Sequence, residues 1–135
     1  MPFITVQLGQ CGNQLGTAFF NSLMNDTFGK DGSSQTSLDQ YQKDLLDRFF
    51  IRNEAKGGKS SYTPRSVLID MESKVILQSL ATARQCSHWQ YSNKQYFSQK
   101  AGSGNNWAHG YCVHGKECDA AIDDLIRTQV EDCDR

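Results

Sequence analysis

The chain has 135 residues, a net charge of −1, and contents of 38% hydrophobic and 21% charged residues. This length and composition favour one globular domain with a modest core and exclude a largely disordered chain. The small net charge argues against a general nucleic-acid binder, and no apolar run approaches the roughly 18–20 residues that span a bilayer, so we expect neither nucleic acid nor membrane insertion.

The first predicted element is a buried strand over Phe3–Leu8, a short run of apolar and β-branched residues. A glycine turn follows at once, consisting of Gly9, Gln10, Cys11 and Gly12. A helix is predicted from about Gln10 to Phe28. Such a turn aims free backbone N–H groups and the positive end of a helix at one point, which suits a phosphate. Its spacing matches neither the P-loop nor the G-x-G-x-x-G pattern, so a tight turn with close helix packing is the alternative.

The same helix carries a stripe of residues at steps of three and four, which we expect to face the core. The stripe consists of Cys11, Leu15, Ala18, Phe19, Ser22 and Leu23. A polar loop over 29–37, a short helix over Leu38–Phe50 and a second loop over Ala55–Ser61 are expected next.

A second strand is predicted over Arg65–Asp70, with Pro64 at its entrance, and a helix follows from Ser73 to about Ala83. The apolar side of that helix is expected to consist of Val75, Ile76, Leu77 and Leu80. Between strand and helix lie Asp70 and Glu72. Two carboxylates at a strand end beside a phosphate are the usual means of holding Mg²⁺, while capping of the next helix is the plainer role for the same residues.

A third strand is predicted near Tyr96–Ser98, followed by a second glycine loop over 101–106. This loop offers backbone donors and amide side chains from Gly102, Ser103, Gly104, Asn105 and Asn106. It suits either a phosphate or a plain turn that caps the next helix. Trp107 is expected to pack behind the loop as an anchor.

The chain ends in a predicted amphipathic helix. Its expected apolar face consists of Cys118, Ala121, Ile122, Leu125, Ile126 and Val130. A cluster of possible metal ligands lies at the start of this region, at His109, Cys112, His114 and Cys118. The spacing is not a standard zinc pattern, and on a helix Cys112 would leave the face shared by His114 and Cys118.

Strands that alternate with helices predict an α/β fold, a Rossmann-like parallel sheet flanked by helices. Ligands of such sheets bind at the carboxyl ends of the strands. All three loops described above follow strands, so we expect them to converge on one rim. The five cysteines are expected to be reduced thiols, because no signal peptide precedes them.

The three loops together resemble those of a known family. Residues Gly9–Gly16 look like the first nucleotide loop of the tubulins, Asp70–Glu72 like their acidic loop, and Gly102–Gly110 like their third loop and the helix start behind it. Within the family the delta type is most similar, on the stretches Phe3–Leu8, Val67–Ile76 and Gly110–Gly115.

The resemblance implies a GTP-binding cytoskeletal protein of the tubulin type, with GTP or GDP and Mg²⁺ as ligands. It implies phosphate contacts from the loop of Gly9, Gln10, Cys11 and Gly12 and the loop of Gly102, Ser103, Gly104 and Asn105, with Glu72 and Asp70 near Mg²⁺. Ser103 stands where alpha- and beta-tubulins carry alanine, and Gly102 where alpha-tubulin carries an acid.

The resemblance further implies that residues 1–135 are the N-terminal part of a GTP-binding domain whose remainder lies beyond residue 135. Such a piece is expected to be marginally stable and to bind nucleotide weakly, because a short parallel sheet leaves an edge open. Other tubulin subunits and microtubules are the implied partners. The implied location is the cytoplasm and cytoskeleton, at the centriole, basal body and cilium.

Two alternatives of other classes remain at this point. A dinucleotide-dependent oxidoreductase would share the alternating fold, but the glycine spacing fails and no acid follows a second strand at the expected interval. A zinc-binding interaction module would use the histidines and cysteines near residue 112.

Overall fold

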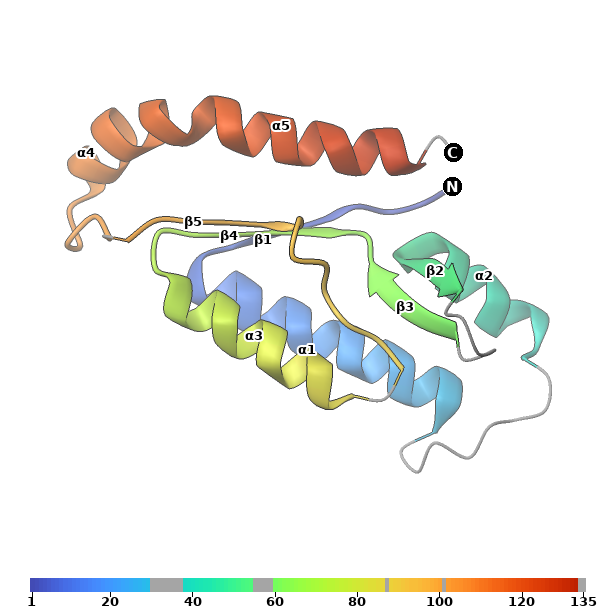
Figure 1. The fold of residues 1–135 in the computed structure, drawn as a ribbon. Coiled ribbons are helices and arrows are strands. Elements are labelled where there is room, and N and C mark those ends of the chain that lie inside the picture. Colours follow the sequence, from blue (N-terminus) through green and yellow to red (C-terminus); the bar gives the residue numbers. More distant parts are fainter. Residues whose placement is uncertain (30–37, 55–59, 87, 101, 134–135) are drawn as a thin grey trace.

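The computed structural model describes residues 1–29, 38–54, 60–86, 88–100 and 102–133. A parallel sheet with the strand order β1–β4–β5 lies at the centre, formed by β1 (Thr5–Leu8), β4 (Ser66–Asp70) and β5 (Tyr96–Ser98). One face of the sheet is covered by α1 (Gly9–Phe28) and α3 (Ser73–Gln85), and the other by α5 (Lys116–Cys133) (Figure 1). The predicted α/β fold, a parallel sheet flanked by helices, is confirmed.

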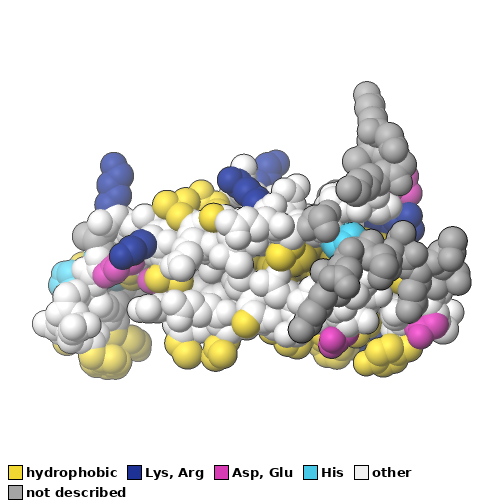
Figure 2. Space-filling model, turned by 90° about the horizontal axis from the view of Figure 1, so that it is seen from below, with side chains coloured by type: hydrophobic (Ala, Val, Ile, Leu, Met, Phe, Trp, Pro, Cys, Tyr) yellow, Lys and Arg dark blue, Asp and Glu magenta, His cyan; other side chains and the backbone are white. Residues whose placement is uncertain are grey.

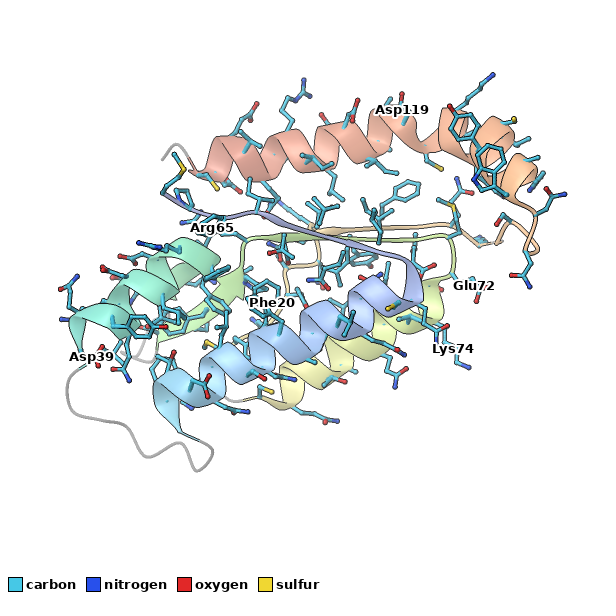
Figure 3. The ribbon with its side chains drawn as sticks, turned by 180° about the vertical axis from the view of Figure 1, so that it is seen from behind. Phe20, Asp39, Arg65, Glu72, Lys74 and Asp119 are labelled. Atoms are coloured by element: carbon cyan, nitrogen blue, oxygen red, sulfur yellow. The ribbon has the colours of Figure 1, made fainter. Side chains whose placement is uncertain are left out.

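The central strand explains why the core forms here. Val67 and Leu68 on β4 have no exposed surface and Ile69 is 6% exposed. A strand buried on both faces reads as a continuous apolar run rather than an alternating one. Below the sheet, the fully buried Phe20 of α1 packs edge-on against Phe50 and Tyr91, between the helix and the sheet (Figure 3).

Helix α1 has nearly the predicted bounds, but of the six residues predicted for its inner face only Leu23 packs against the core. Leu15 is 65% and Phe19 41% exposed, and Cys11, Ala18 and Ser22 are also exposed. The buried residues are Asn13, Gly16, Thr17, Phe20, Met24 and Thr27. The reason is that the first turns of α1 lie against polar groups of the sheet, so its buried face there is small and polar, and an apolar stripe does not mark it.

The inner faces of the other two long helices are partly as predicted. In α3 the buried residues include Ile76 and Leu80, but Leu77 is 54% exposed. In α5 Cys118 is buried, whereas Val130 is 45% exposed and its neighbour Gln129 is buried instead. Gln129 is inside because Gln95, beneath the end of α5, donates a hydrogen bond to its side-chain oxygen at 3.0 Å.

An antiparallel two-stranded sheet was not predicted. It consists of β2 (Phe50–Glu54) and β3 (Ser60–Pro64), and α2 (Gln40–Phe49) precedes it (Figure 1). Helix α2 confirms the short helix predicted over Leu38–Phe50. The last two residues of the loop predicted over 55–61, Ser60 and Ser61, lie instead in β3. Residues 55–59 of that loop lie outside the described residues, as do 30–37 of the earlier one.

The segment before α5 is also helical. It consists of α4 (Trp107–His109) and a π-helical stretch, η1 (Gly110–Gly115). Trp107 is not the buried anchor that the sequence predicted: it is 77% exposed and its ring stacks on that of Tyr111 at 5.0 Å. In the described part of the chain, no helix combines the length and apolarity required to cross a membrane.

Candidate functional site

The three predicted loops meet at the carboxyl ends of the parallel strands. They enclose a hollow of about 390 Å³, which we call the rim hollow. Its lining residues are Gln10, Asp70, Met71, Glu72, Val75, Gly102, Ser103, Gly104 and Asn105. Gln10 follows β1, Asp70 ends β4, and Gly102 to Asn105 follow β5. The sequence therefore predicted most of the lining, whereas it missed Met71 and Val75. Gly9, Cys11 and Gly12 do not line the hollow, although they belong to the same turn.

The first loop turns sharply from β1 into α1. Gly9 has a φ of +66°, a left-handed conformation that glycine adopts without steric cost. Leu8 occupies the N-cap position of α1, and its side chain makes no capping hydrogen bond. The first N–H groups of a helix have no partner within it, so the start of α1 offers donors beside the rim hollow. Cys11 is an exposed thiol on this first turn.

Asn13 holds the first two loops together, and its role was missed from the sequence. Its side chain has no exposed surface, and its Nδ2 donates to the carbonyl of Gly9 at 2.8 Å and to that of Ile69 at 3.2 Å. One amide therefore links the turn after β1 to the end of β4. The available signal was a polar residue immediately after Gly12 and one helical turn after Gly9, within a helix that must pack on a sheet.

The two carboxylates of the acidic loop, Asp70 and Glu72, have different interactions. Asp70 Oδ1 accepts the backbone N–H of Glu72 at 3.1 Å, so Asp70 stabilises the turn that starts α3. Glu72 occupies the N-cap position of α3 but makes no capping hydrogen bond with its side chain. The capping interpretation therefore fits Asp70 better than Glu72, and the exposed Glu72 carboxylate remains available for a cation.

The third loop approaches Glu72 closely. A Cβ on Gly102 would lie 3.0 Å from Glu72 Oε1, so a side chain there would require the end of Glu72 to shift by a few tenths of an ångström. Gly104 and Asn105 both have positive φ, at +62° and +57°, so the loop turns tightly at its tip. Asn106, rather than Asn105, caps the helix that follows, because its Oδ1 accepts the N–H of His109 at 3.1 Å.

A buried polar cluster lies under the sheet near α1. Tyr91 Oη lies 3.2 Å from Thr17 Oγ1 and accepts a hydrogen bond from Gln7 Nε2 at 3.3 Å. Burial raises the pKa of the Tyr91 hydroxyl above its ordinary value, and the hydrogen bonds from Thr17 and Gln7 lower it in part. The cluster therefore favours a neutral tyrosine and ties α1 to the sheet just beneath the rim.

The histidines and cysteines near residue 112 do not form a metal centre. Among the residues that the structure describes, no group of three or more histidine, cysteine or acidic residues could hold a metal ion. As predicted for a helical segment, His114 and Cys118 are buried while Cys112 is exposed. Burial, and to a lesser degree the charge of Glu117, raises the pKa of the Cys118 thiol, so this cysteine behaves as a packing residue.

Comparison with known proteins agrees with this geometry. The family described as "Tubulin/FtsZ family, GTPase domain" matches residues 2–135. Among curated relatives, the tubulin delta chain of Mus musculus is 47% identical over 135 residues, and that of Homo sapiens 45% identical, each comparison covering 99% of this chain and 29% of the relative. The tubulin gamma chain of Caenorhabditis elegans is 34% identical over 128 residues, which cover 95% of this chain and 28% of the relative.

These relatives decide between the classes that the sequence left open. Neither a dinucleotide-dependent oxidoreductase nor a zinc-binding module finds support in the matches or in the described residues. The chain spans less than a third of the length of the curated relatives it matches. The whole-chain family match, together with the loop-bearing rim of a parallel sheet, shows that this chain belongs to the Tubulin/FtsZ family and carries sequence of its GTPase domain.

Proposed function

We propose that this chain is the N-terminal part of a GTP-binding domain and that the rim hollow takes the phosphates of GTP or GDP with Mg²⁺. The observation that carries this proposal is the convergence of Gln10, Glu72 and Asn105, from three loops, on one hollow. Backbone donors at the start of α1 and at the 102–105 turn suit phosphate oxygens, and carboxylates suit a divalent cation.

Each predicted residue has a role in the proposal. Gln10 and the turn of Gly9, Cys11 and Gly12 contact phosphate, the last three through the backbone or by shaping the turn. Gly102, Ser103, Gly104 and Asn105 contact the terminal phosphates. Glu72 would hold Mg²⁺, and Asp70 would support Glu72 through the turn that Asp70 stabilises. Mg²⁺ needs only one or two protein oxygens, so two acids suffice.

We further propose a delta-type cytoskeletal role. The support is the identity of 46% to a tubulin delta chain, against 35% to a tubulin beta chain. On this proposal the partners are guanine nucleotide, other tubulin subunits and microtubules. The location is the cytoplasm and cytoskeleton, at centrioles, basal bodies and cilia.

The test is a double substitution, Gln10→Ala with Glu72→Ala, in the full-length protein that carries this chain. We expect the bound guanine nucleotide, released by denaturation and measured by chromatography, to fall by about tenfold or more, because one phosphate contact and one metal contact are lost. The matched control is Gln14→Ala with Glu117→Ala, two exposed residues that do not line the rim hollow. Occupancy that is equal in the two variants would contradict the assigned roles.

A further inference from the structure

A second cavity lies at the opposite end of the sheet from the rim hollow. It has a volume of about 750 Å³, and we call it the basal cleft. Its walls come from the β2–β3 sheet, the segment that leads into β5, and the last turns of α5. Figure 3 shows the separation: Arg65, which lines the basal cleft, precedes β4, whereas Glu72 of the rim hollow follows it. The cleft is therefore independent of the proposed nucleotide site.

The charges around the basal cleft are mainly positive. Arg65, Arg84 and Lys94 line it, against a single acidic lining residue, Asp132. In the described part of the chain the one ion pair joins Arg127 to Asp124, so none of these three cations forms an ion pair with a described acid. Cations that face one enclosed space without paired acids create a local field that attracts anions.

Arg65 is the least solvated of the three cations. Its backbone is fixed, because its N–H donates to the carbonyl of Phe49 at 2.8 Å and its own carbonyl accepts from Thr5 at 2.9 Å. Its Nη1 has a weak contact with Cys133 Sγ at 3.5 Å, and its buried Nε has no hydrogen-bond partner among the described residues. A partly buried guanidinium that lines a cleft and forms no ion pair with a described acid is suited to receive a carboxylate or phosphate.

The remaining lining suits a peptide better than a lone ion. Asn53, Gln90 and Gln129 contribute amide side chains, which can both donate to and accept from a peptide backbone. Gln129 is held in place, because its side-chain oxygen accepts from Gln95 Nε2 at 3.0 Å. The volume is in the range of cavities that enclose a ligand of many atoms, and it exceeds what one inorganic anion would fill.

We propose that the basal cleft binds an acidic peptide segment of a partner protein. Carboxylates of the segment pair with Arg65 at the floor and with the exposed Arg84 and Lys94 at the mouth, while the amide side chains hold its backbone. The proposal does not depend on nucleotide binding at the rim hollow.

The test uses the full-length protein that carries this chain and a fluorescein-labelled, end-capped peptide in which three glutamates alternate with glycines. Fluorescence anisotropy at low salt gives the dissociation constant. We expect Arg84→Gln with Lys94→Gln to raise that constant by about tenfold, because two positive charges are lost from exposed positions at the mouth of the basal cleft. Arg65→Gln is a separate variant, checked for folding by circular dichroism. Lys74→Gln is the control for the loss of one positive charge, since Lys74 lies at the start of α3, beyond the end of β4 that is remote from Arg65, and should change the constant by less than about twofold (Figure 3).

Four results would overturn the proposal. The first is equal binding of the same peptide with glutamine in place of glutamate. The second is equal weakening by the double variant and by Lys74→Gln, which would indicate a general charge effect. The third is displacement of the peptide by succinate or inorganic phosphate at the peptide's own concentration, which would indicate a small-anion site. Excess GTP should leave the peptide bound, and displacement by GTP would also contradict the proposal.

Discussion

At the scale of single residues, Gly16 and Gly12 show how differently two glycines of one helix are used. A Cβ on Gly16 would overlap the side chain of Gln7, which is 2% exposed and donates a hydrogen bond to the hydroxyl of Tyr91. A Cβ on Gly12 would make ordinary contact, at 3.4 Å from the carbonyl carbon of Gln7. The close packing proposed as the plain alternative for the glycine turn thus applies to Gly16, while Gly9 makes the turn.

We therefore predict that Gly16→Ala destabilises the chain by about 1–3 kcal/mol, because Gln7 must move and its hydrogen bond must break. Gly12→Ala is the matched control and should be neutral or stabilising by up to about 1 kcal/mol, through the higher helix propensity of alanine. Urea unfolding followed by circular dichroism measures both. Equal free energies of unfolding for the two variants would show that α1 does not pack on Gln7 in this way.

Tyr91 makes the stability of the chain depend on pH. Its raised pKa in the folded state means that folding favours the neutral hydroxyl. This contribution is complete below the pKa of an unfolded tyrosine, about 10, and is lost as the pH rises through the folded-state pKa. We predict that the melting temperature of Tyr91→Phe falls less steeply than that of the unchanged chain between roughly pH 9 and pH 11.

Tyr41→Phe is the control for that pH profile, because Tyr41 is 74% exposed. It should follow the unchanged chain at every pH. A parallel decline for the unchanged chain and Tyr91→Phe would show that another group causes the alkaline loss, and the buried Cys118 thiol, whose pKa is also raised, would be the next to test.

At the scale of elements, α2 begins with a complete capping box. Asp39 Oδ1 accepts the N–H of Gln42 at 2.7 Å, and Gln42 Oε1 accepts the N–H of Asp39 at 2.9 Å. This reciprocal pair satisfies two donors that the helix leaves open. The C-terminal end of the helix leads directly into β2, the first strand of the sheet that walls the basal cleft.

We predict that Asp39→Ala lowers the free energy of unfolding by about 1 kcal/mol, the usual cost of losing an N-cap. Asp47→Ala removes the same charge near the other end of α2, where an acid opposes the helix dipole, and should be neutral or slightly stabilising. Chemical denaturation of both variants under one buffer tests the cap. A loss for Asp47→Ala as large as that for Asp39→Ala would assign the effect to charge rather than capping.

Sequence reasoning placed the strands of the parallel sheet and the long helices, because each has a strong local signal. The run Val67–Ile69 is apolar throughout, and Gly9 and Gly104 mark turns that need positive φ. The β2–β3 sheet escaped prediction because most of its side chains are polar, and in its described strands only Phe50, Tyr62 and Pro64 are buried. Such strands lack the apolar alternation on which prediction relies.

The faces of the helices were harder to predict than the helices themselves. The buried face of α1 includes Asn13 and Thr17, whose hydrogen bonds reach Ile69 and Tyr91. Those partners are far away in the sequence, so no local pattern reveals that polar residues are inside. For the same reason the loops of the rim hollow were predicted individually, whereas the basal cleft, formed by distant segments around Arg65, was not.

At the scale of the whole molecule, β1 is an edge strand of the parallel sheet that is paired on one side only among the described residues. Strand β1 is terminal in the order β1–β4–β5, and its Val6 and Leu8 are 43% and 62% exposed. Leu15 and Phe19 of α1 add further exposed apolar surface, and Figure 2 shows hydrophobic side chains along one long edge of the face that α1 and α3 form. Exposed apolar surface beside an unpaired strand favours association, so marginal stability of the isolated 135 residues stays our prediction.

The two ends of the molecule carry different chemistry. Acidic side chains and backbone donors meet at the rim hollow, while cations and amides line the basal cleft. A single strand, β4, connects them, with Arg65 before it and Asp70 at its end. The proposed nucleotide and the proposed acidic peptide therefore occupy sites that can be probed separately.

The most direct test of the central claim is paramagnetic broadening by Mn²⁺ with GTP, read by amide NMR of the isotope-labelled chain. Mn²⁺ takes the same oxygen ligands as Mg²⁺, and weak binding suffices because small bound populations broaden nearby signals. We predict that Mn²⁺ with GTP selectively broadens Gln10, Glu72 and Asn105 and spares Asn53 and Gln129. Broadening that is uniform, or that is strongest at Asn53 and Gln129, would contradict nucleotide binding at the rim hollow.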